Sequence, residues 1–302
     1  MVLRALLYGH TLTTSINLKN QKMKTQMQKL SIDTKIRLNN GIEMPILGFG
    51  TYQIGGGTKA QDAVRYALEA GYKLIDTAAM YENEEEVGEA VRQSAIPREE
   101  IFVTTKLRNS DHGYRAAITA CEKSLEKLGL SYLDLYLIHW PVEDLRNETW
   151  KALESLLGEG KCRAIGVSNY MIWHLEELLD NSRTIPAVNQ VEFNPYLYQE
   201  DLLEFCRSHH IQLESYSPLT KGSKLHDPKL LDLASKYSKS PPQILIRWAL
   251  QSGVVTVPKS SKKERIFENS DVFDFTISPE DMKALDSFDE GLRTSWDPST
   301  AP

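Results

Sequence analysis

The sequence has few cysteines and no long apolar run. Its three cysteines, Cys121, Cys162 and Cys206, are odd in number, lie far apart and form no C-x-x-C pair. This spacing argues against a disulfide framework and against a cysteine-based metal site, so we expect reduced thiols and no bound metal. No apolar stretch approaches the roughly 18 residues of a membrane-spanning helix, so we expect no membrane partner.

The first 32 residues contain no acidic residue. Their basic residues lie among Thr, Gln and Asn side chains and are Arg4, Lys19, Lys22, Lys24 and Lys29. A transit peptide can have this composition, but so can an unstructured tail or a segment upstream of a later start at Met23 or Met27. We favour an unstructured tail or an upstream segment over a transit peptide. Residues 1–34 are therefore expected to be an extension, and residues 35–302 a single folded domain.

The chain also has no excess of positive charge. It carries 35 Lys and Arg against 41 Asp and Glu, which gives a net charge of -6 at pH 7. A nucleic-acid-binding surface needs a basic face, so the charge gives no support to a nucleic-acid partner. The length of 302 residues allows two domains or one large one. We expect a cytoplasmic protein that acts as a monomer.

Eight short apolar runs alternate with segments of helical periodicity. The runs are expected to be strands: Ile46–Gly50, Tyr72–Ile75, Ile101–Thr105, Leu133–Ile138, Ala164–Val167, Val188–Val191, Gln212–Ser215 and Val254–Val257. Helices are expected at about 58–70, 83–94, 112–128, 148–158, 170–181, 199–207, 227–251 and 279–288, and the segment 227–251 could be one helix or two. This alternation, without a break in composition, predicts one α/β domain built as a (β/α)8 TIM barrel.

Residues 35–45 precede the first run and are expected to form a β-hairpin that closes the bottom of the barrel. Asn40-Gly41 supplies the positive φ angles of a tight turn. The alternative fold, an open doubly wound sheet, would carry a G-x-G-x-x-G loop after its first strand. The glycines at Gly48–Gly50 and Gly55–Gly57 do not have that spacing, so the barrel is favoured.

Four polar residues come at or just after the ends of three neighbouring runs: Asp76, Tyr81, Lys106 and His139. In a parallel barrel these ends meet at one face, where active sites lie. An ammonium beside a phenol favours the phenolate, so Lys106 is expected to lower the pKa of Tyr81 while Asp76 orients Lys106. Each residue alone could be structural. Together they predict an enzyme in which Tyr81 acts as general acid and His139 positions a carbonyl oxygen.

Several segments at these positions resemble the signatures of one enzyme family. Gly71–Ala90, Leu133–Pro141, Ile165–Asn169 and Val257–Asn269 are similar to segments of the aldo-keto reductases. The resemblance covers residues 35–296. It implies a (β/α)8 barrel that reduces carbonyl groups with a nicotinamide cofactor, and it places Asp76, Tyr81, Lys106 and His139 on the catalytic tetrad of the family.

The resemblance also implies the cofactor-binding residues. Ser168, Asn169 and Gln190 match residues that bind the nicotinamide carboxamide, Tyr216 matches the residue that stacks on the ring, and Ser217-Pro218-Leu219 begins a loop over the pyrophosphate. Gly50, Thr51 and Tyr52 form the first strand end of the same rim.

A group of cations and hydroxyls follows the last run. Lys259, Ser260, Ser261 and Arg265 suit a dianionic phosphate, since a guanidinium can bind phosphate with two hydrogen bonds. In the family this segment receives the adenosine 2′-phosphate, and Glu268 and Asn269 match adenine contacts. NADPH/NADP+ is the cofactor that this implies. The alternative is a solvated charged stretch on a surface helix.

The substrate is expected to be a small carbonyl compound. Tyr52, Tyr81 and Trp140 would wall the pocket, and Arg108 at its mouth could favour a carboxylate or polyhydroxyl chain or could face water. The loop after His139 and the tail after Arg293 are short, which predicts an open pocket for small aldehydes, dicarbonyls or keto-sugars. Two other functions stay open: an NAD-preferring alcohol dehydrogenase and a cofactor-binding protein without turnover.

Overall fold

The computed structural model describes residues 30–301. The chain divides into two units, Met1–Ser31 and Ile32–Pro302, and the second contains all the elements described below. Most of the expected extension, residues 1–34, lies outside the described residues, which include only its last five.

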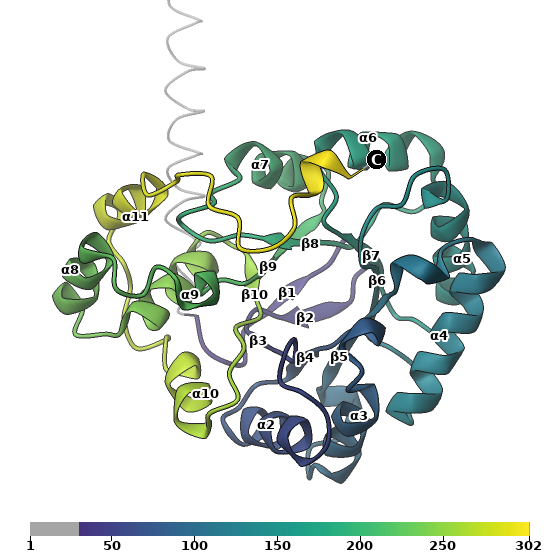
Figure 1. Ribbon diagram of the computed structural model, residues 1–302, viewed down its shortest axis with the longest axis horizontal. Coiled ribbons are helices and arrows are strands. Elements are labelled where there is room, and N and C mark those ends of the chain that lie inside the picture. Colours follow the sequence, from purple (N-terminus) through teal and green to yellow (C-terminus); the bar gives the residue numbers. More distant parts are fainter. Residues whose placement is uncertain (1–29, 302) are drawn as a thin grey trace, which may run out of the picture. The chain divides into compact units, whose positions relative to one another are not determined.

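Eight parallel strands form one sheet in the order β10-β9-β8-β7-β6-β5-β4-β3. They are β3 Gly48–Gly50, β4 Leu74–Asp76, β5 Phe102–Leu107, β6 Leu135–Ile138, β7 Ile165–Ser168, β8 Val188–Glu192, β9 Gln212–Tyr216 and β10 Val255–Thr256. A parallel bridge between Leu47 and Thr256 joins the two edges of the sheet. The predicted (β/α)8 barrel is therefore confirmed (Figure 1).

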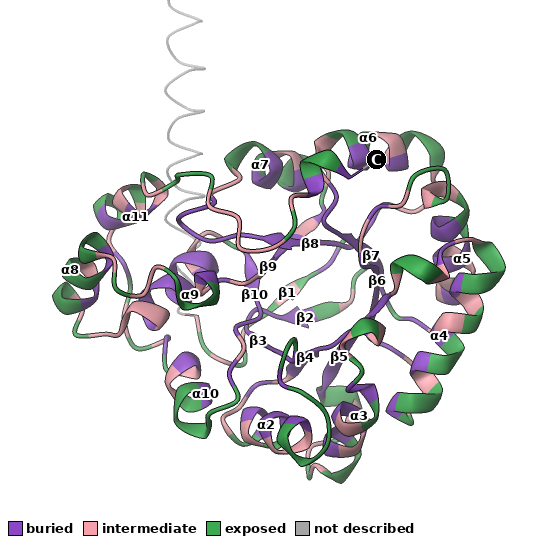
Figure 2. Cartoon of the chain, in the orientation of Figure 1, coloured by how far each residue is buried: buried purple, intermediate pink, exposed green. Residues whose placement is uncertain are grey.

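Helices surround the sheet and turn their apolar faces towards it. They are α2 Thr58–Glu69, α3 Glu84–Gln93, α4 Tyr114–Leu128, α5 Arg146–Gly158, α6 Ile172–Asn181, α7 Glu200–Ser208, α8 Pro228–Lys236, α9 Pro241–Gln251, α10 Lys263–Ser270 and α11 Pro279–Asp286. In α4 the buried residues Ala117, Cys121, Ser124 and Leu128 recur at the spacing of a single helical face. Figure 2 shows the same division between buried inner and exposed outer faces around the ring.

The expected hairpin closes one end of the barrel. Strands β1 Lys35–Arg37 and β2 Glu43–Pro45 pair antiparallel, and Gly41 in the connecting turn has φ 88°. Leu38 and Met44 are buried in a cluster with barrel residues that include Leu74. This cluster fills the amino-terminal end of the barrel, so the functional groups gather at the opposite end.

The segment at 227–251, for which the sequence allows one helix or two, consists of two helices. α8 ends at Lys236, and α9 begins after Ser240, whose backbone N–H donates to Gln243 at 3.0 Å. Pro241 and Pro242 follow directly. A proline has no backbone N–H to donate inside a helix, so it is tolerated only in the first turn. The two prolines therefore begin α9, and the helix before them ends.

The bottom of the barrel holds a buried carboxylate, Asp134, just before β6. Its oxygens accept hydrogen bonds from the Val103 N–H at 3.0 Å and from Arg163 at 3.0 Å, and Arg98 lies 2.8 Å away. A buried charge is tolerated when it is paired and hydrogen-bonded in this way. Asp134 thus ties β5, β6 and the chain before β7 together far from the functional end.

Among residues 30–301 no helix is long and apolar enough to cross a membrane, and no cluster of three or more His, Cys, Asp or Glu could hold a metal ion. The three cysteines are buried and free.

Candidate active site

A buried ion pair lies at the carboxyl end of β4 and β5. Lys106 Nζ donates to both oxygens of Asp76, at 2.6 and 2.8 Å, and to the Thr77 carbonyl at 2.9 Å. Lys106 is 0% exposed and Asp76 3%. Both residues lie inside the strands rather than just past them, because the ladder extends to Asp76 and Leu107. All three Nζ protons are therefore used, which fixes the ammonium in one position.

A third strand also contacts this pair. Gln190 on β8 donates from Nε2 to Asp76 Oδ2 at 2.8 Å. The sequence associates Gln190 only with the cofactor. Here its side chain also orients the carboxylate that holds Lys106, a contact between residues 114 positions apart that no local pattern reveals.

Tyr81 ends a short 3-10 turn, η1 Ala79–Tyr81, that follows β4. Its ring centroid lies 5.0 Å from that of Tyr52 and 5.7 Å from that of His139, and Lys106 Nζ lies 5.1 Å from the ring centroid. The structure therefore brings together the four residues that the sequence predicts at one site.

The ionisation of Tyr81 differs from the prediction. Burial raises the pKa of Tyr81 well above its usual range, and the Asp76 carboxylate, Tyr52 and Glu214 raise it further. The predicted lowering is not found, because burial and the Asp76 carboxylate dominate the pKa of Tyr81. Tyr81 is consequently a protonated phenol at neutral pH.

His139, directly after β6, is a neutral imidazole. Burial lowers its pKa well below the usual range, and the Lys106 charge adds to that effect. Its Nδ1 is buried and has no hydrogen-bond partner among residues 30–301. The Tyr81 phenol and the His139 ring thus both keep a neutral form near neutral pH, which suits hydrogen bonding to one oxygen atom.

The turn that carries Tyr81 is fixed by side chains on both sides. Asn83 accepts from Thr77 Oγ1 at 2.8 Å and donates to the Thr51 carbonyl at 3.1 Å. On the other side, Arg108 Nη2 donates to the Ala79 carbonyl at 2.8 Å and lies 3.1 Å from Glu82 Oε1.

Arg108 and Thr51 both make hydrogen bonds to the backbone around the site. Arg108, considered from the sequence as a substrate contact, spends Nη2 on the Tyr81 turn while its side chain remains 36% exposed. Thr51 is fully buried and donates its hydroxyl to the Asp76 carbonyl oxygen at 3.0 Å. Gly50 gives its N–H to the Pro258 carbonyl, whereas Tyr52 is 43% exposed.

The next strand ends carry a connected set of amides and hydroxyls. Ser168 donates to the Gln190 carbonyl at 2.7 Å, Asn169 Nδ2 donates to the His139 carbonyl at 2.9 Å, and Tyr216 donates to Asn169 Oδ1 at 2.8 Å. Asn169 adopts φ 64°, the left-handed conformation that Asn tolerates. Amide and hydroxyl groups each offer both donors and acceptors, as a carboxamide does. This set therefore fits the nicotinamide end of a cofactor.

The loop after β9 contains unusual backbone angles. Ser217, Thr220 and Lys221 have φ of 48°, 50° and 49°. Pro218 is buried and Leu219 is partly buried between them. Several residues with positive φ in one short loop are held by surrounding structure, and such segments are often found at binding sites.

The cationic group lies beside the start of α10. Lys259 Nζ donates to the Gln53 carbonyl at 3.0 Å, and burial lowers its pKa. Ser260 accepts from the Lys262 N–H at 3.1 Å, while Ser261 and Arg265 are exposed; Glu268 is partly buried and Asn269 is buried. A partly desolvated ammonium, followed along the chain by an exposed hydroxyl and an exposed guanidinium, fits an incoming phosphate.

The C-terminal segment supplies an aromatic residue that the sequence interpretation missed. Glu192, at the end of β8, accepts from the N–H groups of Thr294 at 2.8 Å and Ser295 at 3.1 Å. Trp296 follows, 57% exposed, with its ring centroid 4.8 Å from that of Trp140. In Figure 1 this segment runs in yellow past the ends of β8 and β9. The tail is short but still reaches the rim, and an aromatic residue close to the C-terminus is the signal that could have indicated it.

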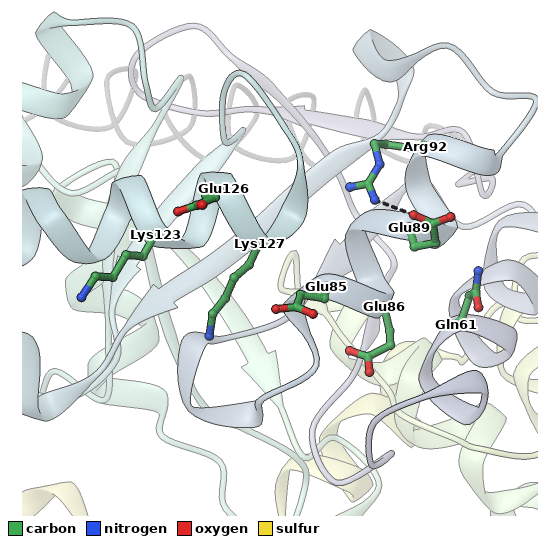
Figure 3. A pocket seen from close by; sticks show the side chains of 8 residues that line it. All are labelled: Gln61, Glu85, Glu86, Glu89, Arg92, Lys123, Glu126 and Lys127. Atoms are coloured by element: carbon green, nitrogen blue, oxygen red, sulfur yellow. Dashed lines mark hydrogen bonds and ion pairs between the residues drawn. The ribbon is translucent and has the colours of Figure 1, made fainter.

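A hollow lies on the outside of the barrel, along α3 and α4. Charged residues of α3 and α4 line it together with Gln61 (Figure 3), and they include Arg92, which pairs with Glu89 at 2.6 Å. These side chains form a solvated surface of mixed charge, away from the strand ends. The hollow therefore adds nothing to the site described above.

Comparison with known proteins identifies relatives over most of the chain. The family model "Aldo/keto reductase family" matches residues 46–290. Glyoxal reductase of Bacillus subtilis is 49% identical over 268 residues, 89% of this chain and 97% of the relative. The structure of an aldo-keto reductase from a Medee basin deep-sea metagenome has 46% identity and a TM-score of 0.86, covering 88% of this chain and 99% of its own.

A Bombyx mori aldo-keto reductase, solved in complex with NADP, has 38% identity and a TM-score of 0.81, covering 87% of this chain and 95% of its own.

Proposed function

The chain belongs to the aldo/keto reductase family, and on that premise we propose that it reduces small aldehydes and ketones to alcohols with NADPH. In this proposal Tyr81 donates the proton to the carbonyl oxygen. The observation that carries it is the convergence of the Asp76–Lys106 ion pair, the Tyr81 phenol and the neutral His139 imidazole at one end of the barrel.

The cofactor would be held by the strand-end groups of β7, β8 and β9 and by the start of α10. Ser168, Asn169 and Gln190 would hold the carboxamide, and Tyr216 would flank the ring. Lys259 and Arg265 would hold phosphate groups, which supports NADPH over NADH because the additional phosphate needs a cationic partner. Bound there, NADPH supplies the hydride, and alignment of the reactants is the protein's task.

The ionisation states favour the direction of reduction. A raised pKa keeps the Tyr81 phenol protonated, and a lowered pKa keeps His139 neutral, so at neutral pH the acid that reduction requires is present. A positioned general acid contributes about 10²–10⁴-fold to the rate. Oxidation of an alcohol would need the Tyr81 phenolate, whose formation burial and the Asp76 carboxylate oppose.

The substrate would meet an aromatic wall. Tyr52, Trp140 and Trp296 lie around the end of the barrel where Tyr81 lies, and both Tyr52 and Trp296 are more than one-third exposed. A pocket lined by exposed aromatic side chains suits small aldehydes, dicarbonyls and keto-sugars. The similarity to a glyoxal reductase supports a dicarbonyl as the first compound to examine.

We assign Arg108 to the support of the Tyr81 turn, since its Nη2 bonds the first residue of that turn. The exposed remainder of its guanidinium leaves room for a second role towards a substrate carboxylate.

The experiment that tests the proposed function is NADPH oxidation over a panel of methylglyoxal, aromatic aldehydes, aldoses and diketo-acids, with the alcohol product identified. We expect turnover with NADPH for at least the dicarbonyls and aldehydes. Binding of NADPH, seen as quenching of tryptophan fluorescence, without turnover of any member of the panel would contradict the proposal and favour a protein that only binds the cofactor.

Three buried, free cysteines are consistent with a reducing compartment, and we propose a cytoplasmic protein. We also propose a monomer whose catalytic domain spans residues 35–302, with residues 1–34 as an extension to it.

A further inference from the structure

Beneath the four-residue site lies a second buried carboxyl group, Glu214 on β9. It is 0% exposed, and neither carboxyl oxygen has a hydrogen-bond partner among residues 30–301. Other buried acids differ in this respect: Asp76 and Asp134 each receive several donors, and Glu192 holds the C-terminal segment. A buried carboxylate without a donor is costly, so Glu214 needs an explanation of its own.

The position of Glu214 relates it to the Asp76–Lys106 pair. Glu214 lies beside Gln190 in the register of β8 and β9, and neighbours in register point to the same face of a sheet. Gln190 donates to Asp76 inside the barrel, so Glu214 faces the same interior. The strand on its other side, β10, presents Val255 at the paired position.

The charged and titratable groups that face Glu214 come from four elements. They are Asp76 on β4, Tyr81 on η1, Lys106 on β5 and, two positions along its own strand, Tyr216. Of the two flanking strands, β10 carries no charged residue, and β8 carries only Glu192 at its end, which is bound to the tail. Lys106 is the only cation among these groups, and its three protons already go to Asp76 and Thr77.

Two carboxylates and one ammonium would leave an excess negative charge in a buried space. The Asp76–Lys106 pair is neutral by itself, so an ionised Glu214 would lack a counter-ion. A carboxyl group in this situation keeps its proton. Burial and the Asp76 charge raise the pKa of Glu214 to about 8, against the opposing effects of the Gln190 amide and Lys106.

We propose that Glu214 is a positioning residue that acts as a neutral acid, leaving Lys106 and Gln190 to Asp76. Its ionisation draws both donors away from Asp76 and disturbs the groups around Tyr81. Glu214 thereby sets the alkaline limit of carbonyl reduction. This inference rests on the proposed function, because it concerns the pH dependence of the same site.

The test compares the pH profile of kcat/KM for wild type and Glu214→Gln, from about pH 6 to about pH 10. Glutamine keeps the shape of the protonated acid and cannot ionise. We expect equal activity near neutral pH, a decline of about tenfold or more in wild type as the pH rises through the Glu214 pKa, and no such decline in the variant, since small misplacements of catalytic groups are costly. An inflection that remains in Glu214→Gln would overturn the proposal.

A matched control is Asp134→Asn, which neutralises an equally buried carboxyl at the opposite end of the barrel. This variant loses its pairing with Arg98 and Arg163 and is expected to be less stable. It should still show the wild-type inflection. If it also abolished the inflection, the effect would reflect general loosening of the barrel and the assignment to Glu214 would fail.

A second measurement does not depend on turnover. Glu214 binds its proton more tightly in the folded chain than in the unfolded chain, where a Glu pKa is about 4.3. The contribution of Glu214 to wild-type stability therefore falls as the pH rises from that value to about 8, and does not change further above it. The Tm of Glu214→Gln should exceed that of wild type by a margin that widens over this interval. A constant margin would contradict the proposal.

If the glutamine variant does not fold, infrared titration of the wild-type protein still decides. A protonated carboxylic acid band should persist at neutral pH and disappear as the pH rises through about 8. Its absence at neutral pH would overturn the proposal. The proposed function fails separately, if no carbonyl compound is turned over at any pH.

Discussion

At the scale of single residues, the site depends on the Lys106 ammonium, which donates hydrogen bonds to three acceptors. Lys106 is fully buried, and its charge is balanced by Asp76. A buried pair of this kind is weak as a source of stability, but removal of one partner leaves an uncompensated charge. The pair therefore links stability and activity at the same two side chains.

We predict that Lys106→Met lowers the free energy of unfolding by about 3–5 kcal/mol, because it leaves the buried Asp76 carboxylate without a counter-ion. The double variant Asp76→Asn, Lys106→Met removes both charges and should recover much of that stability in urea titrations, without recovering carbonyl reduction. If the double variant were as unstable as the single one, the two charges would not be coupled as the 2.6 Å contact requires.

At the scale of elements, the short turn η1 is the most dependent on its neighbours. A three-residue 3-10 turn has little stability of its own. Lys106 and Arg108, two positions apart on and just after β5, bond Thr77 and Ala79 in the connection that leads to Tyr81. The strand thus fixes the loop that carries the acid.

Replacing Arg108 should therefore affect rate more than binding. We predict that Arg108→Ala lowers kcat for a neutral aldehyde by about tenfold with little change in KM, because the Tyr81 turn loses its Ala79 contact. The control is Glu82→Gln, which keeps a hydrogen-bond acceptor for Arg108 and should be nearly silent. If Arg108→Ala raised only the KM of carboxylate-bearing aldehydes, the residue would act on the substrate and not through the turn.

The start of α10 is a second element whose role can be separated by variants. We predict that Arg265→Ala weakens NADPH binding by about tenfold, the worth of a charge-assisted hydrogen bond, while NADH binding is unchanged. Lys263, on the same helix, lies 3.5 Å from Glu69 and near the Tyr66 ring, so Lys263→Ala should affect neither nucleotide. Tryptophan fluorescence titrations give both constants, and equal losses for the two nucleotides would contradict the phosphate assignment.

At the scale of the whole molecule, the sequence predicts most of what depends on local pattern. Alternating apolar runs and helical periodicity define the barrel, and the helix expected from residue 279 does begin there, where Ser278 accepts from the Asp281 N–H at 3.2 Å. Strand ends place Asp76, Lys106 and His139 on one face because parallel strands share a direction.

The parts that the sequence does not predict are set by contacts between distant segments. The raised pKa of Tyr81 follows from burial and from the nearby Asp76 carboxylate, neither of which a linear pattern reveals. Trp296 lies against Trp140 in a tail that distant residues hold, among them Glu192 and Lys221. The sequence likewise does not reveal that Glu214 lies beside Gln190 in the sheet, or that its carboxyl oxygens have no hydrogen-bond partner among residues 30–301.

The central claim is that Tyr81 protonates the carbonyl oxygen, and a single-turnover measurement tests it most directly. Enzyme loaded with NADPH is mixed with saturating methylglyoxal, and the decay of NADPH absorbance is followed for wild type and Tyr81→Phe. We predict a rate about 10²–10⁴-fold slower in the variant, with unchanged NADPH affinity. Equal single-turnover rates for the two proteins would contradict the account.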